Sequence, residues 1–159
     1  MEQKAEDFST QALGTLTIVI GLPGSGKTTY INNLADQNSQ LSIYDDYQGE
    51  AYNNDSDPRL SKHFGELVGN LKKAKNVIVS DIRYCIPHEL NVFLGTVLSA
   101  APNVRIELKY FENNPEACRK NILFRNRENR VDQELELLNK LTSGYVLPSI
   151  EHLTVHVSA

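Results

Sequence analysis

The sequence predicts a single α/β domain, a three-layer α/β/α sandwich in which helices cover both faces of a parallel sheet of about five strands. Short β-branched runs alternate with helical patterns along nearly the whole chain, and parallel strands need crossover connections of this size. The length of 159 residues, with 40% hydrophobic and 23% charged residues, fits one globular domain and excludes disorder or a fibrous fold.

The first predicted unit is a strand, a glycine-rich loop and a helix. Residues 1–14 are polar and predict a tail, so that the domain occupies residues 15–159. Residues 15–20 form a β-branched run, and the glycine-rich segment 21–29 follows it at once. A helical pattern then continues to the polar cluster 36–39.

The remaining chain repeats the alternation of strands and helices. Further strands are expected at residues 41–44, 76–80, 104–111 and 153–157. Helices are expected over residues 58–74, behind a cap at Asp57, then from Pro87 onward, and again around Val131. The helix after Pro87 has apolar residues at core-facing spacing, namely Leu90, Phe93, Leu94, Val97 and Leu98.

Composition narrows the range of partners. The net charge of −4 argues against a nonspecific basic coat for nucleic acid but allows a local positive groove. No apolar run approaches the roughly 18–20 residues of a membrane span, and residues 1–14 lack the apolar centre of a secretory signal. We therefore expect a cytoplasmic protein without a membrane partner.

Cys85 and Cys118 lack metal-ligand spacing and are expected to pack as small hydrophobes. No pattern bears on the oligomeric state.

The strongest motif is the phosphate loop at residues 21–28, which fits G-x-x-x-x-G-K-[ST] between a strand and a helix. Glycines allow successive backbone N–H groups to surround phosphate oxygens at a helix N-terminus. Lys27 would reach the β- and γ-phosphates, and the Thr28 hydroxyl would hold Mg²⁺. ATP and Mg²⁺ are the expected cofactors, and the expected nucleotide-binding residues are Gly21, Pro23, Gly24, Ser25, Gly26, Lys27, Thr28 and Thr29.

Missing motifs exclude two classes of phosphate-loop protein. ATPases that activate water usually carry Asp-Glu after a strand, whereas residues 77–79 lead into Ser80-Asp81 without a glutamate. A GTPase would need N-K-x-D, and the nearest match, at residues 139–142, lacks the aspartate. Phosphoryl transfer to a bound acceptor remains, and this reaction needs a carboxylate for the acceptor proton and cations for the transferred group.

The sequence contains both the carboxylates and the cations that phosphoryl transfer to an acceptor needs. Asp45, Asp46 and Asp81 follow predicted strands, whose carboxyl ends line the ligand crevice of a parallel sheet. Between residues 119 and 130 lie five cations, against the single acid Glu128. The alternatives are that the aspartates form turns or caps and that the cations form a solvated helix face.

Four segments together resemble the small phosphate-loop kinases, specifically the kinase domain of phage-type polynucleotide kinase and its relatives. These segments are residues 21–29, Tyr44-Asp45-Asp46-Tyr47, residues 77–81 and residues 110–116. The resemblance implies the sheet order 2-3-1-4-5 and a role for Asp45 as the general base that activates a 5′-hydroxyl. It also implies an arginine-rich lid near residues 119–131, with Arg125, Arg127 and Arg130, in this order, as the catalytic candidates.

The acceptor site departs from that family. Gln48 stands where the family has an arginine that grips the acceptor's phosphate, and Arg83, after Asp81, could replace the missing cation. Asp46, Gln48, Asp81 and Arg83 are therefore the candidates for binding the acceptor. The acceptor is expected to be the 5′-hydroxyl of a polynucleotide or nucleotide. Two alternatives stay open: a kinase for a nucleoside, nucleoside monophosphate or sugar, and a nucleotide-binding module without transfer.

Overall fold

The computed structural model describes residues 13–47, 58–60, 63–148, 153–155 and 157. Its centre is a parallel sheet of five strands in the order β2-β3-β1-β4-β5. The strands are β1 (Thr15–Ile20), β2 (Ser42–Asp45), β3 (Val77–Ser80), β4 (Arg105–Phe111) and β5 (Leu153–Val155). The predicted fold class and strand order are confirmed.

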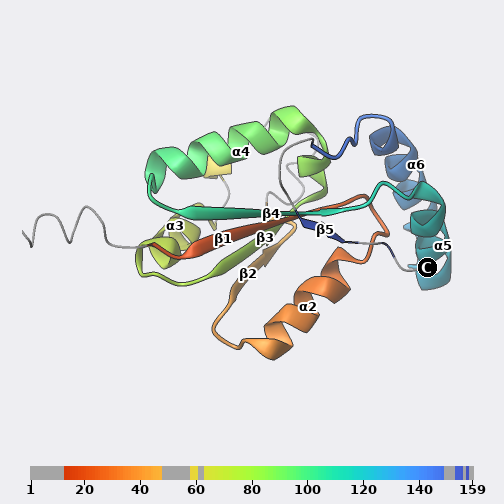
Figure 1. Cartoon of the computed structure of the whole chain (residues 1–159). Helices are drawn as coiled ribbons and strands as arrows, with labels where there is room; N and C mark the ends of the chain where they lie inside the picture. The colour runs from red at the N-terminus through yellow and green to blue at the C-terminus, as the bar shows by residue number, and fades with distance from the viewer. Residues whose placement is uncertain (1–12, 48–57, 61–62, 149–152, 156, 158–159) are drawn as a thin grey trace, which may run out of the picture.

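Helices lie on both faces and at one end of the sheet (Figure 1). Helix α4 covers one face, α2 covers the opposite face, and α5 and α6 pack against each other at the carboxyl ends of the strands. The helices are α2 (Lys27–Gln37), α3 (Phe64–Lys72), α4 (Pro87–Ala100), α5 (Pro115–Arg125) and α6 (Val131–Thr142). Two short 3-10 helices, η2 (Pro58–Leu60) and η3 (Ile82–Cys85), complete the described elements.

The core forms where β1 lies between β3 and β4. Leu16, Ile18 and Ile20 of β1 are fully buried, as is Phe93 of α4. The Phe93 ring stacks on that of Tyr84, with centroids 4.9 Å apart, and packs edge-on against that of Tyr47 at 5.4 Å. This aromatic cluster joins α4 to the segments that follow β2 and β3, which are the segments expected to carry the site.

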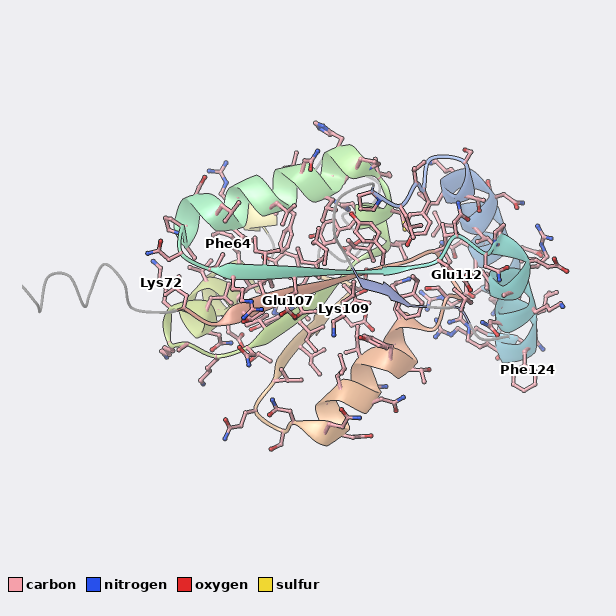
Figure 2. The ribbon with its side chains drawn as sticks, viewed as in Figure 1. Phe64, Lys72, Glu107, Lys109, Glu112 and Phe124 are labelled. Carbon is pink, nitrogen blue, oxygen red and sulfur yellow. The ribbon has the colours of Figure 1, made fainter. Side chains whose placement is uncertain are left out.

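The sheet face toward α2 is more polar. Glu107 and Lys109 of β4 point to this side (Figure 2), and the Lys109 Nζ lies 5.5 Å from the centroid of the Tyr30 ring on α2. Tyr30 in turn packs edge-on against Phe111 at the end of β4. Helix α2, which follows the glycine loop, is thereby held against the carboxyl-terminal half of β4.

The structure differs from two local predictions. The helix expected over residues 58–74 is a short η2 followed by α3, which begins at Phe64; Asp57 lies outside the described residues. Ala74 adopts the left-handed conformation, with φ of 61°, which ends the helical path before β3. Leu98 is 41% exposed because it lies beside, rather than on, the buried row of α4.

Candidate nucleotide-binding site

The glycine loop connects β1 to α2. Gly24 and Gly26 have φ angles of 81° and 96°, a region that side-chain-bearing residues avoid. Gly26 is the N-cap of α2 and supplies no side-chain acceptor. The N–H groups of the first helical turn therefore lack an intrahelical partner, and the positive end of the helix dipole faces the loop. This arrangement is an anion site of the kind that binds phosphate groups.

The loop is packed tightly from both sides. A Cβ at Gly21 would lie 2.6 Å from Ser25 Oγ, and one at Gly24 would lie 2.5 Å from the carbonyl oxygen of Cys118 on α5. Ser25 is buried, and its hydroxyl makes no hydrogen bond with any described part of the chain. The lack of space for a side chain therefore favours glycine at Gly21, and both conformation and lack of space require glycine at Gly24.

The Lys27 ammonium lies inside the loop. Its Nζ donates hydrogen bonds to the carbonyl oxygens of Gly21, at 2.7 Å, and Leu22, at 3.0 Å. Burial of the amine lowers the pKa of Lys27 below its ordinary value, while nearby acidic groups such as Asp45 oppose this shift. The loop therefore holds a desolvated cation that a phosphate group would stabilise.

Thr28 and Asp45 meet at the rim of the loop. Thr28 Oγ1 donates a hydrogen bond of 2.9 Å to Asp45 Oδ2, and both residues are exposed. Asp45 is the last residue of β2, so the contact joins the second strand to the first turn of α2. A hydroxyl oxygen and a carboxylate oxygen side by side are hard ligands of the type that suits Mg²⁺.

The candidates for binding the acceptor have different environments. Asp46 is exposed and has a left-handed φ of 54°, which turns the chain away from β2. Asp81 is buried, and its Oδ1 accepts a hydrogen bond of 2.9 Å from the Arg83 N–H, so it caps η3. Arg83 is also buried, with 2% exposure. Gln48 lies outside the described residues.

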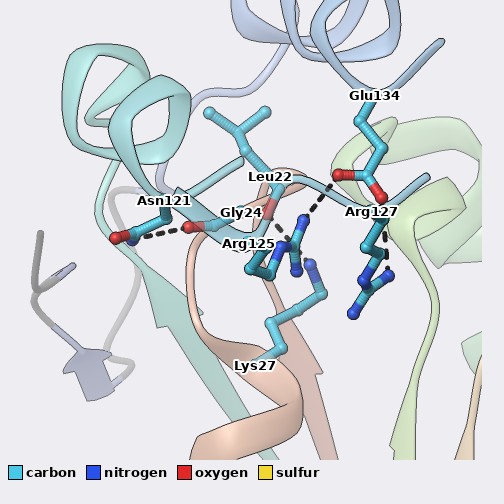
Figure 3. A network of polar contacts seen from close by, with 7 residues as sticks. All are labelled: Leu22, Gly24, Lys27, Asn121, Arg125, Arg127 and Glu134. Atoms are coloured by element: carbon cyan, nitrogen blue, oxygen red, sulfur yellow. Dashed lines mark hydrogen bonds and ion pairs between the residues drawn. The ribbon is translucent and has the colours of Figure 1, made fainter. Parts of the chain in front are cut away.

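The first two candidate arginines share one carboxylate. Glu134 of α6 forms ion pairs with Arg125 Nη2 at 2.8 Å and with Arg127 Nη1 at 3.4 Å, and its side chain is only 15% exposed (Figure 3). Arg130 is exposed at the N-cap of α6. The structure therefore brings Arg125, the last residue of α5, close to Arg127 in the segment that joins α5 to α6, while Arg130 lies at the far end of that segment.

Helix α5 contacts the glycine loop directly. Asn121 Nδ2 donates a hydrogen bond of 2.9 Å to the Gly24 carbonyl oxygen (Figure 3), and Cys118 and Ile122 are buried. Residues 119–125 of the expected lid thus belong to a helix that packs on the loop. The Tyr145 hydroxyl, beyond α6, contacts the carbonyl oxygens of Ile20 and Phe111 at the ends of β1 and β4.

Asn121, Glu134 and Tyr145 were not singled out from the sequence. Asn121 and Gly24 are separated by 97 positions, and no local pattern indicates such a contact. The cluster of arginines was a usable signal for Glu134, because a group of cations needs a nearby carboxylate where it is partly buried. Cys85 and Cys118 are buried free cysteines, as expected.

The fold and the glycine loop define a phosphate-loop protein of the α/β class. The sequence model of the AAA_33 family, described as an AAA domain, matches residues 16–148. The chain belongs to this family. None of the described helices is long and apolar enough to cross a membrane.

Three known proteins illustrate the similarity. An uncharacterized protein of Acanthamoeba polyphaga mimivirus is 31% identical over 130 residues, covering 82% of this chain and 85% of the viral protein. The structure of a gluconokinase from Sinorhizobium meliloti has a TM-score of 0.61 at 14% identity, covering 94% of this chain and 86% of the other. A fungal RNA kinase has a TM-score of 0.59 at 16% identity, covering 92% and 78%. The two structural likenesses concern the fold.

Proposed function

We propose that this protein transfers the γ-phosphate of ATP to a hydroxyl acceptor, the 5′-hydroxyl of a polynucleotide or nucleotide. The observation that carries the proposal is the hydrogen bond between Thr28 and Asp45, which sets a carboxylate beside the phosphate loop. A base at this position can take the proton of a hydroxyl that attacks the terminal phosphate. The fold shared with a fungal RNA kinase and the resemblance of residues 44–47 support the choice of acceptor.

In the proposed reaction the acceptor oxygen forms a bond to the γ-phosphorus, and the bond from this phosphorus to the β–γ bridging oxygen breaks. The acceptor proton passes to the Asp45 carboxylate, and ADP leaves. Lys27 contacts the β- and γ-phosphates, and Arg125 and Arg127 stabilise the charge of the transferred group. Thr28 would hold Mg²⁺, which, when bound, neutralises phosphate charge. Asp46, Gln48, Asp81 and Arg83 stay candidates for orienting the acceptor.

The test is transfer of labelled γ-phosphate from ATP, in the presence of Mg²⁺, to a panel of acceptors. The panel contains 5′-hydroxyl DNA and RNA oligonucleotides, nucleosides, nucleoside monophosphates and sugars including gluconate. Labelled oligonucleotide is the expected result. Label only in a small molecule would replace the proposal with a metabolite kinase, and ATP binding without any transfer would replace it with a nucleotide-binding module.

The role of Asp45 has its own test. Asp45→Asn is expected to lower kcat by about 10²–10⁴-fold, the range for loss of a general base, while ATP binding survives. Asp36→Asn is the matched control, because it removes the same charge from an exposed position on α2. Steady-state rates with the best acceptor and ATP titrations measure both effects. An unchanged kcat in Asp45→Asn would remove this residue from the mechanism.

A further inference from the structure

The outer face of α5 exposes apolar side chains among cations. Phe124 is 91% exposed and Leu123 is 52% exposed, whereas Ala117, Cys118 and Ile122 form the buried face of the helix. Phe124 points away from the body of the molecule (Figure 2). An aromatic ring exposed to this extent, beside a second exposed apolar side chain, is accessible to a ligand.

The charges around Phe124 indicate the chemistry of that ligand. Lys120 lies one helical turn before Phe124, and Arg119 lies one turn before Leu123, so each apolar side chain has a cation as a neighbour on the helix surface. The acid on this face is Glu116, whose Oε1 lies 3.9 Å from Lys120 Nζ. In a chain of net charge −4, this is a local positive surface.

We infer that the exposed face of α5 binds a single-stranded segment of polynucleotide, with a base stacked on Phe124 and phosphates near Arg119 and Lys120. Aromatic rings beside cations suit single strands, because every base has a π-face and the backbone carries one charge per nucleotide. The inference deepens the proposed function and rests on it for the identity of the acceptor. The nucleotides that bind this face are distant from the nucleotide whose hydroxyl reacts.

The inference is distinct from binding of ATP at the loop. Phe124 lies on the side of α5 opposite Ile122, which packs on Gly24, and its ring is 91% exposed, although Asn121, which binds the Gly24 carbonyl oxygen, lies one turn before it. A substitution at Phe124 can therefore alter contacts with an oligonucleotide without altering the glycine loop. This separation allows the two binding events to be measured independently.

The experiment measures binding of a fluorescent 5′-hydroxyl single-stranded oligonucleotide of about 12 nucleotides to the full chain by anisotropy. Phe124→Ala is expected to weaken binding by about five- to a hundred-fold, the range for loss of one stacked base. Phe124→Trp should retain affinity, and Phe124→Leu should not. Leu98→Ala, a change at an exposed leucine on α4, is the matched control. The combined change Arg119→Gln and Lys120→Gln should reduce the salt slope by about 1.4.

Several outcomes would overturn the inference. They are an oligonucleotide that does not bind the wild type, an unchanged affinity in Phe124→Ala, and an equal loss of ATP affinity in that variant. Retention of affinity by Phe124→Leu would also overturn it, since an apolar contact would then suffice. If Phe124-dependent binding occurs without phosphate transfer to any acceptor, only the proposed function fails. If oligonucleotides are phosphorylated with equal KM by wild type and Phe124→Ala, only this inference fails.

Discussion

At the residue scale, the site combines groups whose environments are unfavourable until a ligand arrives. Lys27 keeps an ammonium group in a buried loop, where two backbone carbonyl oxygens replace water only in part. Asp46 adopts a left-handed conformation directly after Asp45. Such features concentrate at functional sites because ligand contacts offset their cost.

The lowered pKa of Lys27 predicts how stability depends on pH. Because burial lowers this pKa below 10.5, the unfolded chain binds the proton more tightly than the folded protein. Between the lowered value and 10.5, the unfolded state therefore holds more protons, and stability rises with pH. The free energy of unfolding of the wild type, minus that of Lys27→Met, should increase across this window in urea titrations. A difference that stays constant up to pH 10.5 would contradict the burial of the charge.

At the element scale, α6 holds Arg125, at the end of α5, and Arg127, just beyond that helix. Glu134 binds Arg125 and Arg127 through separate carboxylate oxygens, so one side chain sets the direction of two guanidinium groups. Arginines that act on a transferred phosphoryl group contribute mainly to kcat, because the charge they stabilise develops in the transition state. Glu134 is therefore expected to act as a positioning residue.

Glu134→Gln should lower kcat by about tenfold, with little change in KM for ATP. This loss is smaller than the loss expected when a catalytic arginine itself is removed. Glu136→Gln is the control, since Glu136 is exposed on the same helix. Glu134→Asp should recover part of the rate because it restores the charge. Steady-state kinetics measure these values. If Glu134→Gln instead tightens ATP binding and raises kcat, the carboxylate holds the arginines away from the phosphates.

The packing of α5 on the glycine loop leads to a second prediction at this scale. A side chain at Gly24 would meet the Cys118 carbonyl oxygen at 2.5 Å and Ile122 Cγ1 at 2.8 Å, so Gly24→Ala must displace α5 or the loop.

Burial raises the pKa of Cys118 to about 11 and that of Cys85 to about 12, so both thiols should react slowly near pH 8.

In Gly24→Ala, alkylation of Cys118 should accelerate by at least about tenfold, whereas that of Cys85 on η3 should change less. Mass spectrometry of iodoacetamide-treated protein resolves the two sites. Gly95→Ala, on α4, is the control because no atom lies within 4 Å of its added Cβ. Equal acceleration at both cysteines would show global destabilisation, and no acceleration would show that α5 accommodates the methyl group.

At the scale of the whole molecule, the alternation of strands and helices and the phosphate loop could be predicted from local or repeated signals, whereas the strand order was implied by the resemblance to the small phosphate-loop kinases. The glycine pattern lies within residues 21–28, and the alternation of strands and helices spans the chain. The placement of Asp45 at the edge of the sheet that carries the phosphate loop followed from the rule that parallel strands end at one edge, and the structure adds its hydrogen bond with Thr28. The contacts of Asn121 and Tyr145 could not be predicted, because they depend on how α5 and the chain beyond α6 pack after the sheet has formed. The arginine cluster, by contrast, indicated a nearby carboxylate, which the structure identifies as Glu134.

The aromatic cluster links this site to global stability. Phe93 is fully buried and contacts Tyr47 after β2 and Tyr84 of η3, so its ring supports the segments that follow two site-bearing strands. Phe93→Ala should lower the free energy of unfolding by about 3–5 kcal/mol, because the cavity lies where three elements meet. Leu98→Ala on the same helix, 41% exposed, should cost less than about 1 kcal/mol. Urea denaturation followed by circular dichroism compares the two variants, and similar losses in both would show that α4 packs through a different face.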